Sequence, residues 1–567
     1  MAFKPNSSGV RSYTPKGAKL RPSQIITTFG PGAVVDLPEE SVMIAGIDRW
    51  PLGAIIHEPR LEHALEVKQF RAPALGKFGG DIPSVRFPRH RVCINKECNL
   101  ISWAKTCPEC GKDTYPARLI VICPEGHAND FPWDWWAHRS KKCTGKPKLR
   151  LSNQGRTATL ADLIVVCATC GEQQSLAGAL GARALGSKCS GKHPWLPGAT
   201  DAHCTAQPRS VLRGASNVYF SSLLSALSIP PWTSPVQAAL ENHWNTFLSI
   251  ATDEELQQRL IAKLPDFFGF NLEDVLRAIK ERISGTTTIN TLRQEEFRAF
   301  RNPGSGISHS DFQICAEPVP SVFQNDLQNV ILAHRLREVR VLRGFTRIDP
   351  VDADHVDAPL APIMANPQDW LPAVEHRGEG IFIELKQDRV EAWEARQTVQ
   401  QRMSGLIQAN NKWREQRGLK PLATVMPRVV LIHTLAHLFI RQLSLDCGYS
   451  SSSLRERIYA GPDMCGLLIY TASADSDGSL GGLVQQGLQT RFDATLRALL
   501  ENARWCSSDP LCTEHNPLLT GHIKGAACHA CGLVAETSCE FANRMLDRAF
   551  VCDLPNLPST GFFGNTP

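Results

Sequence analysis

The 567-residue sequence predicts a multidomain chain of mixed α+β and α/β class. Hydrophobic residues make up 43% of it and charged residues 21%, which is typical of globular proteins. Ten of the 19 cysteines fall between Cys93 and Cys204, and five more fall between Cys506 and Cys539. Apolar residues recur at helical spacing in the centre and near the C-terminus. We therefore expect a cysteine-rich N-terminal half, a helical central region and a C-terminal α/β domain.

The N-terminal half is expected to contain two domains. Residues 1–85 predict an α/β region, in which Ile25–Phe29 and Ala33–Val35 form short strands around the turn Gly30–Gly32. Residues 86–210 have few long segments in which apolar residues recur at helix or strand spacing. This is typical of regions in which metal ions bound between turns take the place of a large apolar core.

The remaining chain is expected to form a helical central region and linker over residues 211–373, then a C-terminal domain over residues 374–567. Thr252–Glu255 fits a capping box that begins a helix. Residues 349–373 collect prolines and acidic residues and predict an irregular linker.

In the C-terminal domain, apolar residues from Val390 to Ile407 predict one long helix, and Pro427 opens another. The glycine-rich stretch Thr471–Leu483 predicts a tight turn before a helix from about Leu483, with an anion cradle as the alternative.

The cysteines predict zinc sites. Their number is odd and the N-terminus has no secretion signal, so a disulfide framework is not expected. Short-spaced cysteine and histidine pairs supply the four ligands that zinc prefers. We expect about four zinc ions in four sets of ligands. The first set is Cys93, Cys98, Cys107 and Cys110; the second is Cys123, His127, His138 and Cys143; the third is Cys167, Cys170, Cys189 and Cys204; the fourth is Cys506, Cys512, Cys528 and Cys531.

Two of these sets leave alternatives open. His193 and His203 compete for positions in the third set, and Cys539 is a fifth candidate that could replace Cys506 or Cys512 in the last. No set is accompanied by an open-site motif such as HExxH, so structural sites are favoured over catalytic ones.

Catalytic motifs are not expected in this chain. Residues 186–192 match most of a phosphate-binding loop, but His193 stands where Ser or Thr would hold magnesium. His433 and His437 share a helix face without the glutamate of a zinc protease, which favours core or interface histidines. Arginines between Arg335 and Arg347 favour a solvated or ion-paired face, with phosphate or protein contact as the alternative.

The cysteine-rich region is basic. Residues 86–150 hold 13 basic and 6 acidic side chains, although the whole chain has a net charge of only +5. A local positive excess favours a polyanionic partner such as DNA. The expected phosphate contacts are Arg139, Lys141, Lys142, Lys146 and Lys148.

Several motifs together resemble the DrmB family of the DISARM anti-phage defence system. Those motifs are Arg21–Leu37, Leu336–Val339, Gly344–Arg347, Leu468–Leu483, Ala527–Cys531, Glu536–Glu540 and Asn543–Arg548. They are distributed over nearly the whole chain.

The resemblance implies a C-terminal domain like the zinc-binding domain of MrfA. It also implies a non-catalytic subunit that docks on DrmA, a helicase-like ATPase, and recognises and restricts invading DNA through that complex. The chain has no motor of its own, so no helicase residue can be transferred to it. The alternative functions are a stand-alone zinc-dependent nucleic-acid-binding protein or a hydrolase.

Membrane insertion is not expected, since the longest apolar run, Val429–Ile440, is interrupted by His433, Thr434 and His437. We expect a cytoplasmic location, since the N-terminal residues show no apolar segment of signal-peptide length.

Overall fold

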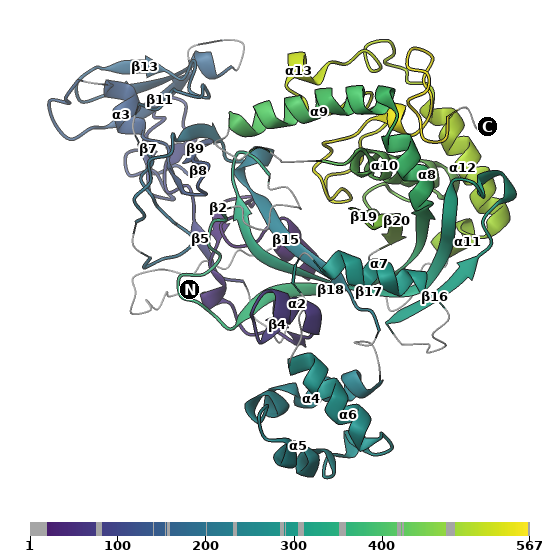
Figure 1. Cartoon of the computed structure of the whole chain (residues 1–567). Helices are drawn as coiled ribbons and strands as arrows, with labels where there is room; N and C mark the ends of the chain where they lie inside the picture. Colours follow the sequence, from purple (N-terminus) through teal and green to yellow (C-terminus); the bar gives the residue numbers. More distant parts are fainter. Residues whose placement is uncertain are drawn as a thin grey trace. The chain divides into compact units, whose positions relative to one another are not determined.

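A computed structural model describes residues 20–564 apart from 75–81, 140, 154, 156–158, 187, 200, 231–234, 284–287, 290, 304–310, 351–358, 417–420, 422–424 and 472–481. The chain forms two compact units, each assembled from segments that are far apart in sequence (Figure 1). Unit 1 comprises residues 1–56, 67–224 and 340–374, and unit 2 comprises residues 57–66, 225–339 and 375–567. The four contiguous domains expected from the sequence stay a prediction.

Unit 1 is built mainly from short strands. Its helices and strands are α1 (Pro22–Thr27), β1 (Val34–Asp36), β2 (Ser41–Ile44), η1 (Ile47–Arg49), β3 (Ile55–Ile56), β4 (Gln69–Arg71), β5 (Ser84–Arg86), β6 (Arg91–Cys93), β7 (Ile101–Ser102), β8 (Thr114–Pro116), β9 (Leu119–Ile122), β10 (Ala128–Asp130), α3 (Trp133–His138), β11 (Leu149–Asn153), η2 (Leu160–Asp162), β12 (Leu163–Cys167), β13 (Gln173–Ser175), β14 (Arg209–Leu212) and η3 (Ser216–Val218).

These strands form small three-stranded sheets with the orders β1-β2-β5, β7-β6-β8, β10-β9-β14 and β11-β12-β13. The strand pairs of these sheets are antiparallel. Cys93 is the last residue of β6, and Cys167 is the last residue of β12. A core that includes Trp133, Trp136 and Val165 lies between α3 and β12. The strand ends therefore deliver cysteines around a small apolar centre.

The expected strand at Ile25–Phe29 is wrong, because residues 22–27 form α1. Pro22 occupies the first helical position, where its missing N–H costs nothing, and the Gln24 side chain accepts from the Arg21 N–H at 3.0 Å. The glycine turn after it is required by packing. Gly32 has φ +83°, and a Cβ there would lie 2.5 Å from the Phe345 ring.

Unit 2 combines helices with a larger sheet. Its remaining helices and strands are α2 (Pro59–Ala64), α4 (Pro235–Ser249), α5 (Glu254–Ile261), η4 (Pro265–Phe267), α6 (Leu272–Ile283), α7 (Leu292–Arg301), β16 (Phe312–Glu317), η5 (Ser321–Phe323), α8 (Gln387–Glu394), α9 (Gln397–Glu415), α10 (Pro427–Cys447), β19 (Leu454–Gly461), β20 (Met464–Thr471), α11 (Gly482–Gln486), α12 (Gln489–Ala503), α13 (Pro517–Thr520) and η6 (Arg548–Phe550). Strands β15 (Phe220–Leu227), β17 (Leu327–Thr346) and β18 (Trp370–Leu385) contribute residues to both units.

The central region is only partly helical. Helices α4, α5 and α6 pack around one another (Figure 1), but residues 327–346 form a 20-residue strand. In that strand Val330 and Leu332 enter one apolar core, whereas Ile331 and Ala333 enter another. This period of two, with both faces buried, is the signature of an internal strand and corrects the helical expectation.

Of three expected helix boundaries, two differ in the structure and one is confirmed. The cap of α5 is Asp253 rather than Thr252, and its carboxylate accepts from the Leu256 N–H at 2.9 Å. The expected long helix over residues 390–407 is two helices, α8 and α9, separated at Ala395 and Arg396. The expected start of α10 at Pro427 is confirmed.

Helix α10 is the central helix of unit 2. It lies against β19 and β20 (Figure 1). Apolar side chains lie on nearly all of its sides. By length and composition it is the one helix among the described residues that could cross a membrane, yet 72% of its apolar window is buried inside the protein. That burial is typical of a core helix. The glycine-rich stretch before α11 lies largely outside the described residues.

Candidate metal centres

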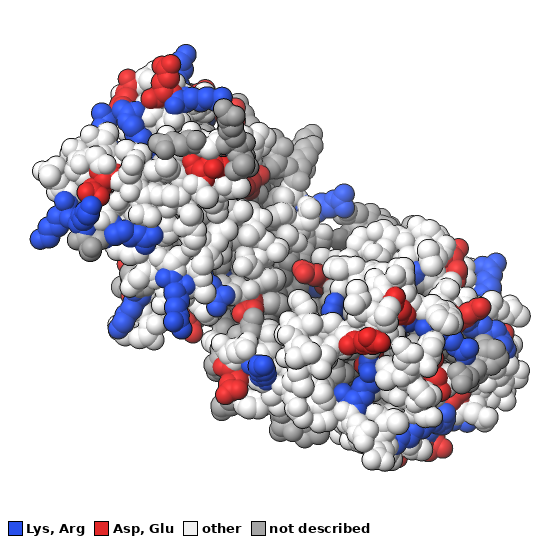
Figure 2. All heavy atoms as spheres, turned by 90° about the horizontal axis from the view of Figure 1, so that it is seen from above, with Lys and Arg blue, Asp and Glu red and all other residues white. Residues whose placement is uncertain are grey.

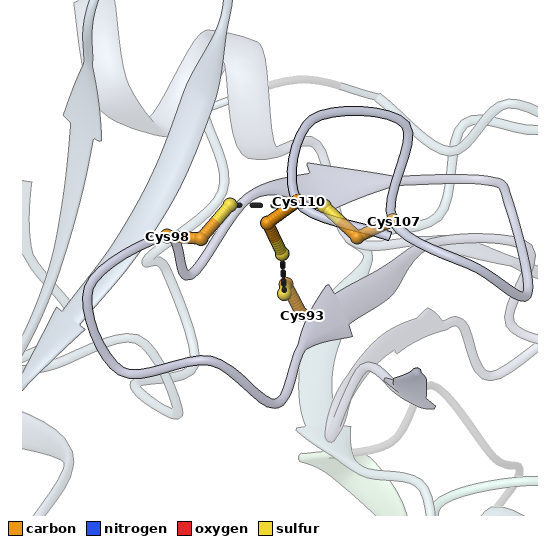
Figure 3. A group of neighbouring side chains, drawn as sticks. All are labelled: Cys93, Cys98, Cys107 and Cys110. Carbon is orange, nitrogen blue, oxygen red and sulfur yellow. Dashed lines mark hydrogen bonds between the residues drawn. The ribbon is translucent and has the colours of Figure 1, made fainter. Parts of the chain in front are cut away.

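The first predicted ligand set is brought together as expected. Cys93 ends β6, Cys98 follows in the turn to β7, and Cys107 and Cys110 precede β8 (Figure 3). The Cys93 and Cys110 sulfurs lie 3.4 Å apart, and those of Cys98 and Cys107 lie 3.7 Å apart. A backbone hydrogen bond from Lys112 is the main cause that lowers the pKa of Cys110 to about 7.

The distances between these atoms fit a bound zinc ion. Four sulfurs about 2.3 Å from a common centre lie about 3.8 Å apart at the corners of a tetrahedron, whereas a disulfide would place two sulfurs about 2.05 Å apart. All 19 cysteines are free thiols in this structure. In each of the predicted regions, groups of four ligand atoms lie within 4.8 Å of one another.

The second and third sets are regrouped. The structure gathers Cys123 and His127 with Cys189 and Cys204, and it gathers His138 and Cys143 with Cys167 and Cys170. The sequence-based grouping, which joined the two pairs nearest in the chain, is therefore wrong for these two sets.

The packing of a helix on a strand explains the exchange. Helix α3, which carries His138, packs on β12, which ends at Cys167. The His138 Nε2 atom thus lies 3.2 Å from the Cys170 sulfur, and the Cys143 and Cys167 sulfurs lie 3.8 Å apart. Backbone hydrogen bonds from Cys170, Lys148 and Thr169 overcome the effect of burial and lower the pKa of Cys167 to about 6.

The other regrouped set lies where the β9–β10 turn meets the loop around Cys189. The Cys123 sulfur is 3.3 Å from the His127 Nδ1 atom. Hydrogen bonding with Cys123 is the main cause that lowers the pKa of Cys189 to about 4. A low pKa favours the thiolate, which is the form that binds metal.

Neither competing histidine belongs to the group that contains Cys189. The His193 ring packs edge-on against His127, with centroids 4.6 Å apart, and His203 is exposed. The loop that resembles a phosphate-binding loop contributes Cys189 to one of these candidate metal-binding groups. Within it, the Gly191 N–H points at the Cys189 sulfur at 3.4 Å.

The fourth set is brought together as expected, without Cys539. Its sulfur separations are 3.5 Å for Cys506 and Cys528 and 3.6 Å for Cys512 and Cys531. Hydrogen bonding with Cys512 lowers the pKa of Cys531 to about 5.

A fifth group was not predicted. His433 and His437, expected to be core or interface histidines, lie with Glu456 and Cys539 within the same 4.8 Å limit. The i,i+4 spacing of two histidines on an apolar helix was the available signal, but Glu456 and Cys539 come from distant segments.

The predicted basic contacts lie directly after α3. Lys142 and Lys146 are exposed. Lys141 forms an ion pair with Glu172 at 2.9 Å, Lys148 pairs with Glu109, and the Arg139 guanidinium lies 3.8 Å from the centre of the Trp136 ring. On the face drawn in Figure 2, Lys and Arg side chains are separated by acidic and uncharged ones.

The arginine cluster at residues 335–347 was expected to form a solvated or ion-paired face. Arg337 is buried and ion-paired with Glu375 at 2.9 Å, which agrees with the second form of that expectation. Arg347 is buried and bonded to backbone groups, so the expectation is wrong for this member. Arg347 donates to the backbone carbonyls of Gly126, Val218 and Gly32 at 2.7, 2.6 and 2.9 Å. This arginine therefore ties the Cys123–His127 turn to other segments of unit 1.

Comparison with known proteins places these groups in context. Residues 21–220 match a family described as a domain of unknown function (DUF8724), and residues 435–532 match the MrfA Zn-binding domain. The latter range contains all four cysteines of the Cys506 group. The chain is also 34% identical over 513 residues to the DISARM protein DrmB of Bacillus paralicheniformis, a match that covers 85% of this chain and 91% of the relative.

Proposed function

This chain belongs to the DrmB family of DISARM proteins, and on that premise we propose that it is a non-catalytic subunit that docks on a helicase-like ATPase, DrmA. Through that complex it supports the recognition and restriction of foreign DNA in the cytoplasm. Membership of the family establishes a role in a DISARM anti-phage defence system. The docking, the DNA contact and the location are the proposed part.

The observation that supports a non-catalytic role is the closed ligand set at each expected zinc site. Each of the four groups offers four side-chain ligands. A catalytic zinc normally keeps one position for water or substrate, whereas a four-ligand site of cysteine and histidine is structural. When bound, zinc would therefore hold these loops in shape, and the chain's own residues would supply the docking surface.

The loop at residues 186–192 supports the same conclusion. In a phosphate-binding loop the backbone N–H groups point at phosphate and a helix follows directly. Here Cys189 is a candidate metal ligand, and none of the described residues from 188 to 208 is helical. ATP hydrolysis is therefore assigned to the partner.

Direct DNA contact is assigned to the loop after α3. Lys142 and Lys146 are exposed there, and the ion pairs of Lys141 and Lys148 are at the surface, where such pairs contribute little and exchange readily with phosphate. The surrounding residues 86–150 keep their excess of 13 basic over 6 acidic side chains.

Copurification tests the docking proposal. The full chain, tagged and coexpressed with a separately encoded helicase-like ATPase of the DrmA type, is expected to retain that ATPase through size-exclusion chromatography. The isolated chain is expected to hydrolyse no ATP. Separate elution of the two proteins would contradict docking. ATP turnover by the isolated chain that is lost in Lys192→Ala would contradict the non-catalytic role.

The DNA contact is tested on the assembled complex. Lys142→Ala with Lys146→Ala is expected to weaken DNA binding and to reduce the slope of log affinity against log salt by about one unit per contact. Lys263→Ala with Lys412→Ala is the matched control, since both lysines are exposed and lie outside the basic region. Equal affinity and slope for the two double variants would contradict DNA contact at this loop.

A further inference from the structure

We propose that His433, His437, Glu456 and Cys539 form a fifth zinc site, buried in unit 2 and separate from the four cysteine-rich sites. The MrfA-type match begins after His433 and ends at residue 532, before Cys539, so it contains His437 and Glu456 but not the complete ligand set. The inference is independent of docking and of DNA contact.

The fold brings the four side chains together from three segments. His433 and His437 lie one turn apart on α10 and face the same way. Glu456 is on β19, which lies against that helix, and Cys539 is on the segment that follows the Cys506 group. A metal ion here would join the core helix, the sheet and the C-terminal segment.

The separations fit a single small cation. The His433 Nε2 atom lies 3.2 Å from Glu456 Oε1 and 3.2 Å from the Cys539 sulfur, and the His437 Nε2 atom lies 3.4 Å from Glu456 Oε2. Nitrogen and oxygen ligands about 2.0–2.1 Å from a tetrahedral zinc lie about 3.3 Å from one another.

The hydrogen bonds of the two rings point to a cation rather than to a hydrogen-bonded core. The His437 Nδ1 atom lies 2.7 Å from the Gly532 carbonyl oxygen, and the His433 Nδ1 atom lies 3.4 Å from that of Met545. A carbonyl oxygen only accepts, so each Nδ1 carries a hydrogen and a neutral ring presents the Nε2 lone pair to the cluster. Metal-ligating histidines are held in this way by an outer hydrogen bond.

Without an ion, His437 and Glu456 would meet at the centre of the cluster as acceptor against acceptor. The His437 Nε2 and Glu456 Oε2 atoms are buried without a hydrogen-bond partner among the described residues. Both rings are fully buried and Glu456 is 2% exposed, so water does not compensate from outside. Protonating both rings instead would place two cations 4.5 Å apart beside one carboxylate.

The backbone around Cys539 repeats a feature of the cysteine-rich sites. The N–H two residues after the cysteine points at its sulfur in Cys93, Cys189 and Cys506, each at 3.4 Å. Cys539 receives the same contact from Phe541 at 3.3 Å and another from Asn543 at 3.2 Å. Such N–H groups stabilise a thiolate, which is the form that binds metal.

Zinc is the metal that this ligand set fits best. One thiolate, two imidazoles and one carboxylate are all accepted by zinc, which has no geometric preference of its own beyond four-coordination in closed sites. Four protein ligands, three of them buried and Cys539 partly buried, leave no open position, so the site is structural.

The test is metal analysis of the full chain. Wild type is expected to hold about five zinc ions after desalting against a weak chelator, Cys539→Ser about four, and the control Cys315→Ser, at an exposed cysteine outside every group, about five. Equal zinc content in wild type and Cys539→Ser would overturn the proposal. One equivalent of a different metal lost in Cys539→Ser would overturn the assignment to zinc.

A measurement on the wild type keeps the test decisive if Cys539→Ser does not fold. X-ray absorption at the zinc edge reports the average number of sulfur and of nitrogen or oxygen atoms bound to each zinc ion. Five sites contain 15 sulfur and 5 nitrogen or oxygen ligands, an average of 3.0 sulfurs per zinc, whereas the four cysteine-rich sites alone average 3.5. A zinc content of five with the lower sulfur average supports the fifth site, and a content of four with the higher average overturns it.

Discussion

The two units place their candidate metal ligands in different surroundings. In unit 1 three groups of ligands lie at the ends of strands of two to five residues, around a small core that includes Cys167 itself. In unit 2 the two groups adjoin a large apolar core built on α10, β19 and β20. In unit 1 bound zinc would take the place of a large apolar core, whereas in unit 2 it would only add to one. We therefore expect the stability of unit 1 to depend much more on zinc than that of unit 2.

The largest effect is expected in unit 1. Cys167→Ser removes a ligand from a fully buried position, so the metal and part of the small core are lost together. We expect a destabilisation of more than about 5 kcal/mol, seen as proteolysis within residues 86–210. Rapid cleavage is expected there while α10 stays protected. Cleavage of both regions at one rate would contradict the difference between the units.

The corresponding change in unit 2 is expected to have a smaller effect. Cys528 is only partly buried, and the adjacent core does not depend on it. Cys528→Ser is expected to remove one zinc ion and to cost about 4 kcal/mol, confined to the loops around residues 506–532. Hydrogen exchange resolves the location, and an unchanged zinc content would remove this group from the set of metal sites.

A third change separates metal from ordinary hydrogen bonding in unit 1. Arg347→Met leaves three backbone carbonyls without their donor, which is expected to cost about 3 kcal/mol. The zinc content should not change, because Arg347 is not a ligand. Chemical denaturation and metal analysis of the same sample check both outcomes. Loss of zinc in this variant would mean that the Cys123 group depends on the surrounding scaffold.

The smallest effect is expected where unit 2 contains no candidate ligand. Helices α4, α5 and α6 share an apolar core of their own. Asp253→Ala removes the cap of α5 and is expected to cost about 1 kcal/mol, measured as faster amide exchange in residues 254–261. Asp253→Asn is the matched control, since asparagine is an equally good cap. A chelator should leave exchange in these helices unchanged.

Local signals in the sequence predicted the positions of the ligands better than their grouping. The spacing of Cys93, Cys98, Cys107 and Cys110 was sufficient, because two short strand pairs, β6–β7 and β6–β8, bring them together. The regrouped sets depend on α3 packing against β12, a tertiary contact that spacing does not encode.

The same limit explains the fifth group and the errors in the fold. His433 and His437 were visible as a pair, but Glu456 and Cys539 reach them only after β19 has packed on α10. Likewise the pattern at residues 327–346 read as helical because both faces of β17 are buried, which removes the alternation of apolar and polar residues. The start of α10 at Pro427 was predicted correctly, because a proline at the first helical position is a signal within the helix itself.

Hydrogen exchange of the purified chain before and after zinc removal by a strong chelator tests the difference between the units most directly. The account predicts that amides of β6, β9 and β12 lose their protection, whereas those of α10 and β20 keep most of theirs. Equal loss in both sets of elements, or full retention in β6, β9 and β12, would contradict the claim that metal replaces the core in unit 1 and only reinforces it in unit 2.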